Sequence, residues 1–189
     1  MIQRLRLEGL VDADWQSLRL GAVIWAPGVL SGIVAAIERS LGVESTWDGL
    51  VERYQHQEVL RRGYDALDMP DAVKGIDALA DEFRVISGAR SVRCQARPTF
   101  RFQRTGSQSV PFHTDDLSGG HGRRILNVWI PLRDTSPSNS LWLVPARESE
   151  DLLLQFRTER WSLEDLDRAA RPRAIAVPMV RGEILVFSN

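Results

Sequence analysis

The spacing of apolar residues changes about halfway along this chain, which restricts it to a fold that combines helices and strands. In residues 29–41 apolar side chains recur at intervals of three and four, which predicts an amphipathic helix. Residues 46–67 carry a weaker helical pattern. After the break at Asp68-Met69-Pro70-Asp71, residues 72–86 again place their apolar side chains on one helical face. The first half is therefore expected to be mainly helical.

The second half reads as short extended runs separated by turn residues, which is typical of an antiparallel sandwich or barrel. The expected strands lie at 99–103, 125–132 and 182–187. Residues 152–156 and 162–170 interrupt them as helices, the second beginning at Ser162. We expect an α+β fold in one domain, residues 1–189, which is helical to about residue 91 and built of strands over about 92–189.

Composition narrows the class of protein. At 189 residues the chain can bury a core without disulfides or metals. The single cysteine, Cys94, excludes a disulfide within the chain and fits a reducing compartment, where we expect it to be a core residue. A formal net charge of −1 gives no electrostatic signature of nucleic-acid binding. The N-terminus mixes charges with apolar residues, so we expect no signal peptide, no membrane span and a cytoplasmic location.

The run Pro111-Phe112-His113-Thr114-Asp115 is the strongest candidate for chemistry. In an extended chain residues i and i+2 point to the same side, so His113 and Asp115 can face one ion. They would supply two ligands of a 2-His-1-carboxylate facial triad, the arrangement that holds non-haem Fe(II) and leaves positions open. The alternative is a surface histidine hydrogen-bonded to a nearby aspartate, but the flanking strands favour metal binding.

Several short sequence motifs follow one another in the second half of the chain. A P-F-H-x-D run at 111–115 is followed by N-x-W-x-P-L at 127–132, S-N-S-L-W at 138–142 and G-E-x-L-x-F at 182–187. Over about residues 95–189 the chain resembles the Fe(II)/2-oxoglutarate-dependent dioxygenases, in particular their phytanoyl-CoA dioxygenase-like and StrG-like branches. The resemblance implies a double-stranded β-helix, the cupin-like jelly roll, with the N-terminal helices packed on one face.

The resemblance also implies an activity. Enzymes of this family use Fe(II), O2 and 2-oxoglutarate, which is decarboxylated to succinate while an unactivated C–H bond is hydroxylated. We expect the substrate to be a small polar metabolite or natural-product intermediate, with no nucleic-acid or membrane partner. In the family a second histidine ligand and an arginine for 2-oxoglutarate follow the strand that matches 182–187. This sequence reaches Asn189 without them. We therefore expect that a C-terminal piece is absent, and that these residues alone bind metal weakly and turn over nothing.

Further residues are candidates for lining the site. Arg101 and Gln103 share one face of their expected strand. If Phe100 and Phe102 on the other face pack against the helices, Arg101 and Gln103 line the barrel mouth and could meet an anionic group. An edge strand with its polar face in water is an equally supported alternative.

The matching family strand points its asparagine inward. This implies co-substrate binding for Asn127 and a place in the cavity wall for Trp129. Asp116 and His121 lie in the segment after the ligand pair, which could form a lid or contact the substrate. His121 as a third ligand is disfavoured, because it would have to fold back across a short loop.

Two further residues, His56 and Trp142, are expected to lie outside the site. His56 reads as a solvated histidine on a surface helix, and Trp142 as a core residue. A second function remains open for the whole chain, namely a jelly-roll binding or scaffold protein that has lost catalytic metal binding. A cupin-type isomerase or lyase ranks last, because such an enzyme binds its metal through several histidines and this chain contains only three.

Overall fold

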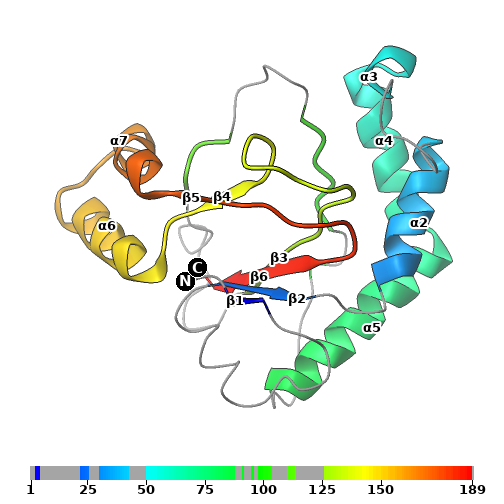
Figure 1. Ribbon diagram of the computed structural model, residues 1–189, viewed down its shortest axis with the longest axis horizontal. Coiled ribbons are helices and arrows are strands. Elements are labelled where there is room, and N and C mark those ends of the chain that lie inside the picture. Colours follow the sequence, from blue (N-terminus) through cyan, green and yellow to red (C-terminus); the bar gives the residue numbers. More distant parts are fainter. Residues whose placement is uncertain are drawn as a thin grey trace. The chain divides into compact units, whose positions relative to one another are not determined.

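The computed structural model describes residues 3–4, 22–25, 30–42, 50–87, 91, 95, 98–103, 110–113 and 126–188. The chain divides into two compact units, one formed by residues 1–26 with 109–189 and the other by residues 27–108 (Figure 1). This division differs from the boundary near residue 91 that the change of period indicates.

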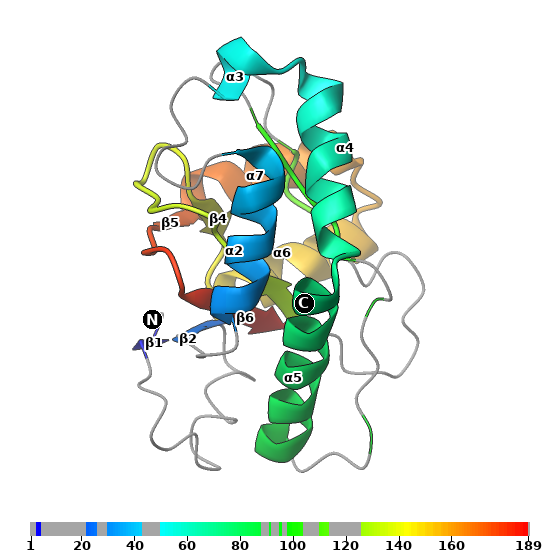
Figure 2. The same ribbon diagram turned by 90° about the vertical axis from the view of Figure 1, so that its right-hand side faces the viewer.

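The unit of residues 27–108 contains the helices that the sequence predicts. They are α2 (Leu30–Leu41), α3 (Leu50–Arg53), α4 (His56–Leu67) and α5 (Pro70–Ser87). Helix α2 lies alongside both α4 and α5 (Figure 2). The helices meet through apolar faces, so burial of these faces holds the unit together.

Helix α2 has one apolar face, which is buried. Ile33, Val34, Ile37 and Leu41 are all almost completely buried, and their spacing places them on one face. Burial of each such side chain contributes about 1.5–3 kcal/mol. The helix ends at Gly42, whose φ of 65° lies in the left-handed region that glycine enters without strain.

Residues 99–103 were expected to form a strand, and this prediction is wrong, because they have no strand pairing. Their alternation nevertheless persists. Phe100 is buried directly against Gly63 of α4, and the ring of Phe102 lies 5.8 Å from that of His56. The aromatic side chains pack on a helix instead of on a neighbouring strand. His56 is on a helix as predicted, but it is half-buried rather than fully solvated.

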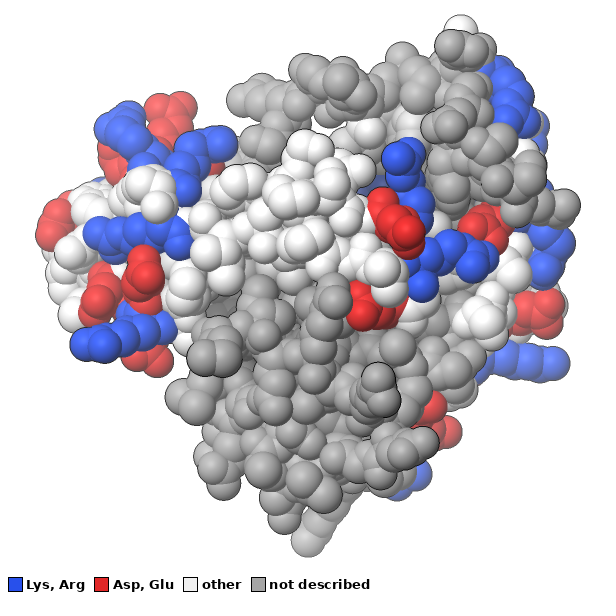
Figure 3. Space-filling view, viewed as in Figure 1, with Lys and Arg blue, Asp and Glu red and all other residues white. Residues whose placement is uncertain are grey.

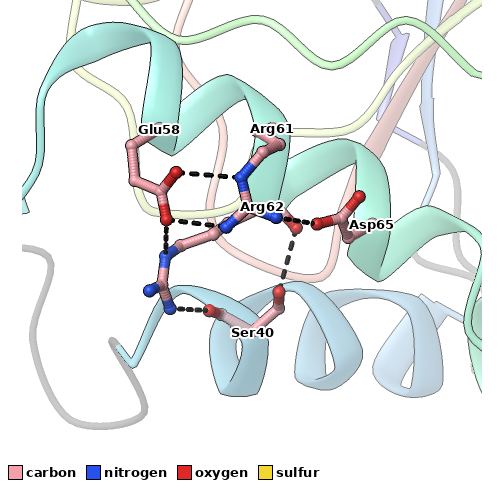
Figure 4. A network of polar contacts seen from close by, with 5 residues as sticks. All are labelled: Ser40, Glu58, Arg61, Arg62 and Asp65. Carbon is pink, nitrogen blue, oxygen red and sulfur yellow. Dashed lines mark hydrogen bonds and ion pairs between the residues drawn. The ribbon is translucent and has the colours of Figure 1, made fainter.

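A polar network joins α4 to α2 (Figure 4). The Ser40 hydroxyl donates to the Arg62 carbonyl at 2.9 Å, and the Arg62 guanidinium donates to the Ser40 carbonyl at 3.3 Å. Glu58 accepts hydrogen bonds from Arg61 at 2.7 and 2.9 Å and from Arg62 at 2.7 Å. These bonds, from Arg61 first, lower the pKa of Glu58 from 4.5 to about 2. The ionised carboxylate thus orients Arg62 toward α2.

The other unit contains a four-stranded sheet in the order β1 (Gln3–Arg4), β2 (Ala22–Trp25), β6 (Ile184–Ser188) and β3 (Leu126–Trp129). Strand β6 pairs antiparallel with both β2 and β3. Strand β6 therefore has a hydrogen-bonded neighbour on each side. Residues 22–25 supply a partner that the period of the first half did not reveal.

A second sheet pairs β4 (Leu141–Leu143) with β5 (Ile175–Val177) in antiparallel register. One apolar cluster contains side chains of both sheets. Its members are Val177, Met179 and Leu185, with Trp129, Leu141, Leu143 and Phe187 packed against them. The result is a mixed helix-and-sheet architecture, and the complete jelly roll stays a prediction.

Trp142 was expected in the core, and this prediction is wrong. Leu141 and Leu143 face the cluster, so the pleat turns Trp142 outward, where it is 46% exposed. Its indole N–H donates to the Pro137 carbonyl at 3.2 Å. This bond holds the side chain against the turn that precedes β4.

Two helices, α6 (Ala146–Thr158) and α7 (Leu163–Ala170), form a hairpin between β4 and β5, and the short 3-10 helix η3 (Arg171–Arg173) follows. Ser162 caps α7 through a reciprocal capping box with Asp165, as the sequence predicts for this start. Arg160 between the helices has a φ of 55°, and the Trp161 amide donates to the Phe156 carbonyl at 3.3 Å. This is the Schellman pattern with arginine at the usual glycine position. In the part of the chain that is described, no helix is both long and apolar enough to cross a bilayer.

The close approach of Phe100 to α4 yields a prediction for Gly63→Ala. A Cβ at this position would overlap the Phe100 ring, so either the ring or the helix must move. We expect the free energy of unfolding to fall by about 1–3 kcal/mol, measured by urea titration followed by circular dichroism. Gly32→Ala is the control, because among the described residues its Cβ would meet only the Asp71 carbonyl, at 3.6 Å. A Gly63→Ala protein as stable as Gly32→Ala would contradict this packing.

The network around Glu58 yields a prediction of pH dependence. Because the folded pKa is about 2 and the ordinary value 4.5, the stabilisation is complete above pH 4.5 and is lost as the pH falls toward 2. Glu58→Gln should therefore lower the free energy of unfolding at pH 7, and its difference from wild type should shrink between pH 4.5 and 2. Asp81→Asn, whose carboxylate lies 3.5 Å from Arg84, should change stability little at pH 7. A Glu58→Gln difference that stays constant with pH would refute this account.

Candidate functional site

His113 is exposed and lies in the described segment 110–113 of the sheet-containing unit. Its Nδ1 lies 2.8 Å from the carbonyl oxygen of Pro111. A carbonyl can only accept, so Nδ1 carries the proton and, in the neutral ring, Nε2 carries the lone pair. Metal-bound histidines commonly have this arrangement, with the second nitrogen donating to a carbonyl or carboxylate. The hydrogen bond sets the tautomer of His113, and metal binding by this residue stays a prediction.

The residue before His113 is held by the α6–α7 hairpin. The Phe112 amide donates to Oδ1 of Asp167 at 2.8 Å, and Oδ2 of Asp167 accepts from Nε of Arg171 at 2.8 Å. The Phe112 amide, and after it Arg171, lowers the pKa of Asp167 below its ordinary value of 3.8. The Phe112 ring packs against the apolar cluster of the hairpin, formed by Leu152, Leu166 and Ala170. Both the backbone and the side chain of Phe112 are thus fixed.

Asn127 and Trp129 share a face of β3, as the alternation in the sequence predicts. Asn127 is opposite Phe187 in the register with β6, and Trp129 is opposite Leu185. Trp129 packs against the cluster between the two sheets, and Val128 on the other face is 38% exposed. Asn127 thus lies on the face of β3 that carries Trp129, while co-substrate binding by Asn127 stays a prediction.

Arg101 and Gln103 belong to the other unit, residues 27–108. Both side chains are exposed, while Phe100 and Phe102, which alternate with them, pack on α4. The condition that the aromatic pair faces the helices is therefore met. Their predicted role toward an anionic group stays a prediction.

Three predicted site residues, Asp115, Asp116 and His121, lie outside the described residues. Among the residues that are described, no three His, Cys, Asp or Glu side chains are grouped so that they could hold a metal ion. His56, in α4, belongs to the unit that does not contain His113. The structure thus describes one of the two predicted ligands, His113.

Sequence reasoning missed Asp167. The sequence shows only an aspartate four residues before Arg171 on a predicted helix, which is the usual pattern of a surface ion pair. Asp167 and Phe112 are separated by 55 residues, and no pattern in the sequence relates them. Only the packing of the hairpin brings the two residues together.

The surface of the α6–α7 hairpin carries interspersed charges of both signs (Figure 3). Arg168 pairs with Asp165 at 3.2 Å and Arg171 with Asp167 at 2.8 Å. Beside it lies an uncharged surface over β4 and β5. The hairpin therefore presents paired charges rather than a patch of one sign.

The chain matched no protein-family model, no curated protein and no solved structure.

Proposed function

We propose that this protein is a non-haem Fe(II)/2-oxoglutarate-dependent oxygenase that hydroxylates a small polar metabolite or natural-product intermediate. The observation that carries the proposal is the hydrogen bond from His113 to the Pro111 carbonyl, 2.8 Å long, in a run where Asp115 follows two residues later. A neutral imidazole with one carboxylate suits Fe(II). The donor that the structure describes therefore fits the ion.

Each residue has a defined task in this proposal. His113 offers the Nε2 lone pair, and Asp115 offers a carboxylate that offsets part of the cation's charge. Asn127 would hydrogen-bond the 2-oxo acid, and Trp129 would exclude water. Bound Fe(II) would supply the centre at which 2-oxoglutarate and O2 react, so that R–H, 2-oxoglutarate and O2 give R–OH, succinate and CO2. We place the reaction in the cytoplasm, because the single Cys94 fits a reducing compartment.

A jelly-roll binding or scaffold protein without catalytic metal is the second candidate. One observation favours it: apolar side chains such as Leu141, Met179 and Leu185 occupy the space between the two described sheets. A barrel enzyme of the resembling family keeps its metal and co-substrate inside the corresponding space. The two candidates differ in whether His113 binds metal, which an experiment can decide.

The metal-binding prediction concerns His113→Ala. Calorimetric titration of the wild-type protein with Mn(II), a stable substitute for Fe(II), should show weak saturable binding, and His113→Ala should abolish it. His56→Ala is the matched control and should bind as wild type does, because the proposal gives His56, in helix α4, no part in metal binding. Wild-type protein without saturable binding, or unchanged binding by His113→Ala, would reject the oxygenase and favour the scaffold.

A turnover assay tests whether these residues complete the ligand set. With Fe(II), ascorbate and 2-oxoglutarate, we expect the 189-residue protein to form no succinate above the level of its His113→Ala variant. The reason is that a facial triad needs a second imidazole. Robust succinate formation that His121→Ala removes would show instead that His121 is the third ligand.

A further inference from the structure

The segment that carries His113 is fixed at two successive residues. The imidazole of His113 is bonded back to the Pro111 carbonyl at 2.8 Å. The Phe112 amide is bonded forward to Asp167 of α7, also at 2.8 Å. The first bond sets the ring relative to its own backbone, and the second sets that backbone relative to a helix.

Asp167 is well suited to this role. Its side chain is only 17% exposed, and Nε of Arg171 holds the second carboxylate oxygen. A hydrogen bond to an ionised acceptor is about twice as strong as one between neutral groups. The carboxylate is therefore a fixed, charged acceptor aimed at one backbone amide.

Helix α7 provides a firm base for this acceptor. The Ser162–Asp165 capping box fixes its first turn. Leu166 and Ala170 are buried, in one apolar cluster with Leu152 of α6. The Phe112 ring packs on the same cluster. Movement of the His113 segment would thus break a charged hydrogen bond and expose an aromatic ring at once.

We propose that Asp167 is a positioning residue for His113: it fixes the Phe112 amide and so holds the imidazole where a ligand is needed. A histidine on a loose segment would have to be ordered when metal binds, and that loss of entropy would weaken binding. The expected effect on metal affinity rests on the proposed function. The effect on the order of the segment does not.

The first measurement is amide hydrogen exchange in the metal-free protein, followed residue by residue by NMR. Asp167→Ala should accelerate exchange at Phe112 by about 10-fold or more, the effect expected on losing a hydrogen bond to a charged group. Asp167→Asn keeps an acceptor oxygen and should restore most of the protection. Asp151→Ala, at an exposed position of α6, is the control and should leave Phe112 unchanged.

The second measurement is Mn(II) affinity of the same variants of the whole chain. Asp167→Ala should weaken Mn(II) binding about 10-fold, as loss of a group supporting a ligand does, and Asp167→Asn should recover it. If Asp167 only stabilised the fold, Asp167→Ala would also accelerate amide exchange in helix α7. Unchanged exchange in α7, together with recovered Mn(II) affinity in Asp167→Asn, would therefore indicate positioning. If Asp167→Ala does not fold, Arg171→Gln replaces it and should accelerate Phe112 exchange to a smaller degree.

The outcomes separate the two proposals. Unchanged exchange at Phe112 in Asp167→Ala, or in Arg171→Gln where Asp167→Ala does not fold, overturns the positioning role whatever the protein does with metal. Faster exchange in a protein whose wild type binds no Mn(II) leaves the positioning role in place and removes the oxygenase. Faster exchange with unchanged Mn(II) affinity overturns the link between the two.

Discussion

Strand β6 is the element on which the sheet-containing unit depends. Its residues Ile184, Leu185 and Val186 are almost completely buried, and it has a hydrogen-bonded neighbour on each side. Leu185 also belongs to the cluster that joins the four-stranded sheet to the two-stranded one. A single short strand therefore links the pairing within one sheet to the packing between two. Disruption of β6 would remove both at once.

The candidate site depends on a different kind of support. His113 lies outside regular strands, so the sheet ladders do not fix it, and the α6–α7 hairpin takes over that task through Phe112. A helical insertion between two strands often looks dispensable. Here it supplies both the charged acceptor and the apolar surface that hold the candidate ligand's neighbour.

Local patterns predicted the elements better than their partners. The helix at 29–41 and the start of α7 at Ser162 follow from spacing and capping, which depend on neighbouring residues only. Trp142 was misassigned because its burial depends on which face of strand β4 packs on the other sheet, and the sequence of one strand does not reveal this. The strand at 99–103 was misassigned because an alternating pattern suits packing on a helix as well as on a strand. The bond between Phe112 and Asp167 depends on tertiary packing alone, so no local pattern could reveal it.

The pairing of β2 with β6 has a consequence for the order of folding. The helical unit is continuous in sequence, so its contacts can form as soon as residues 27–108 have been synthesised. The four-stranded sheet joins residues 22–25 to residues 184–187 and has to wait until β6 leaves the ribosome. Contacts between such distant residues require closure of a long loop and form slowly. During synthesis β1 and β2 therefore remain unpaired with β6 for a long time. In this interval their exposed edges most need protection from other chains.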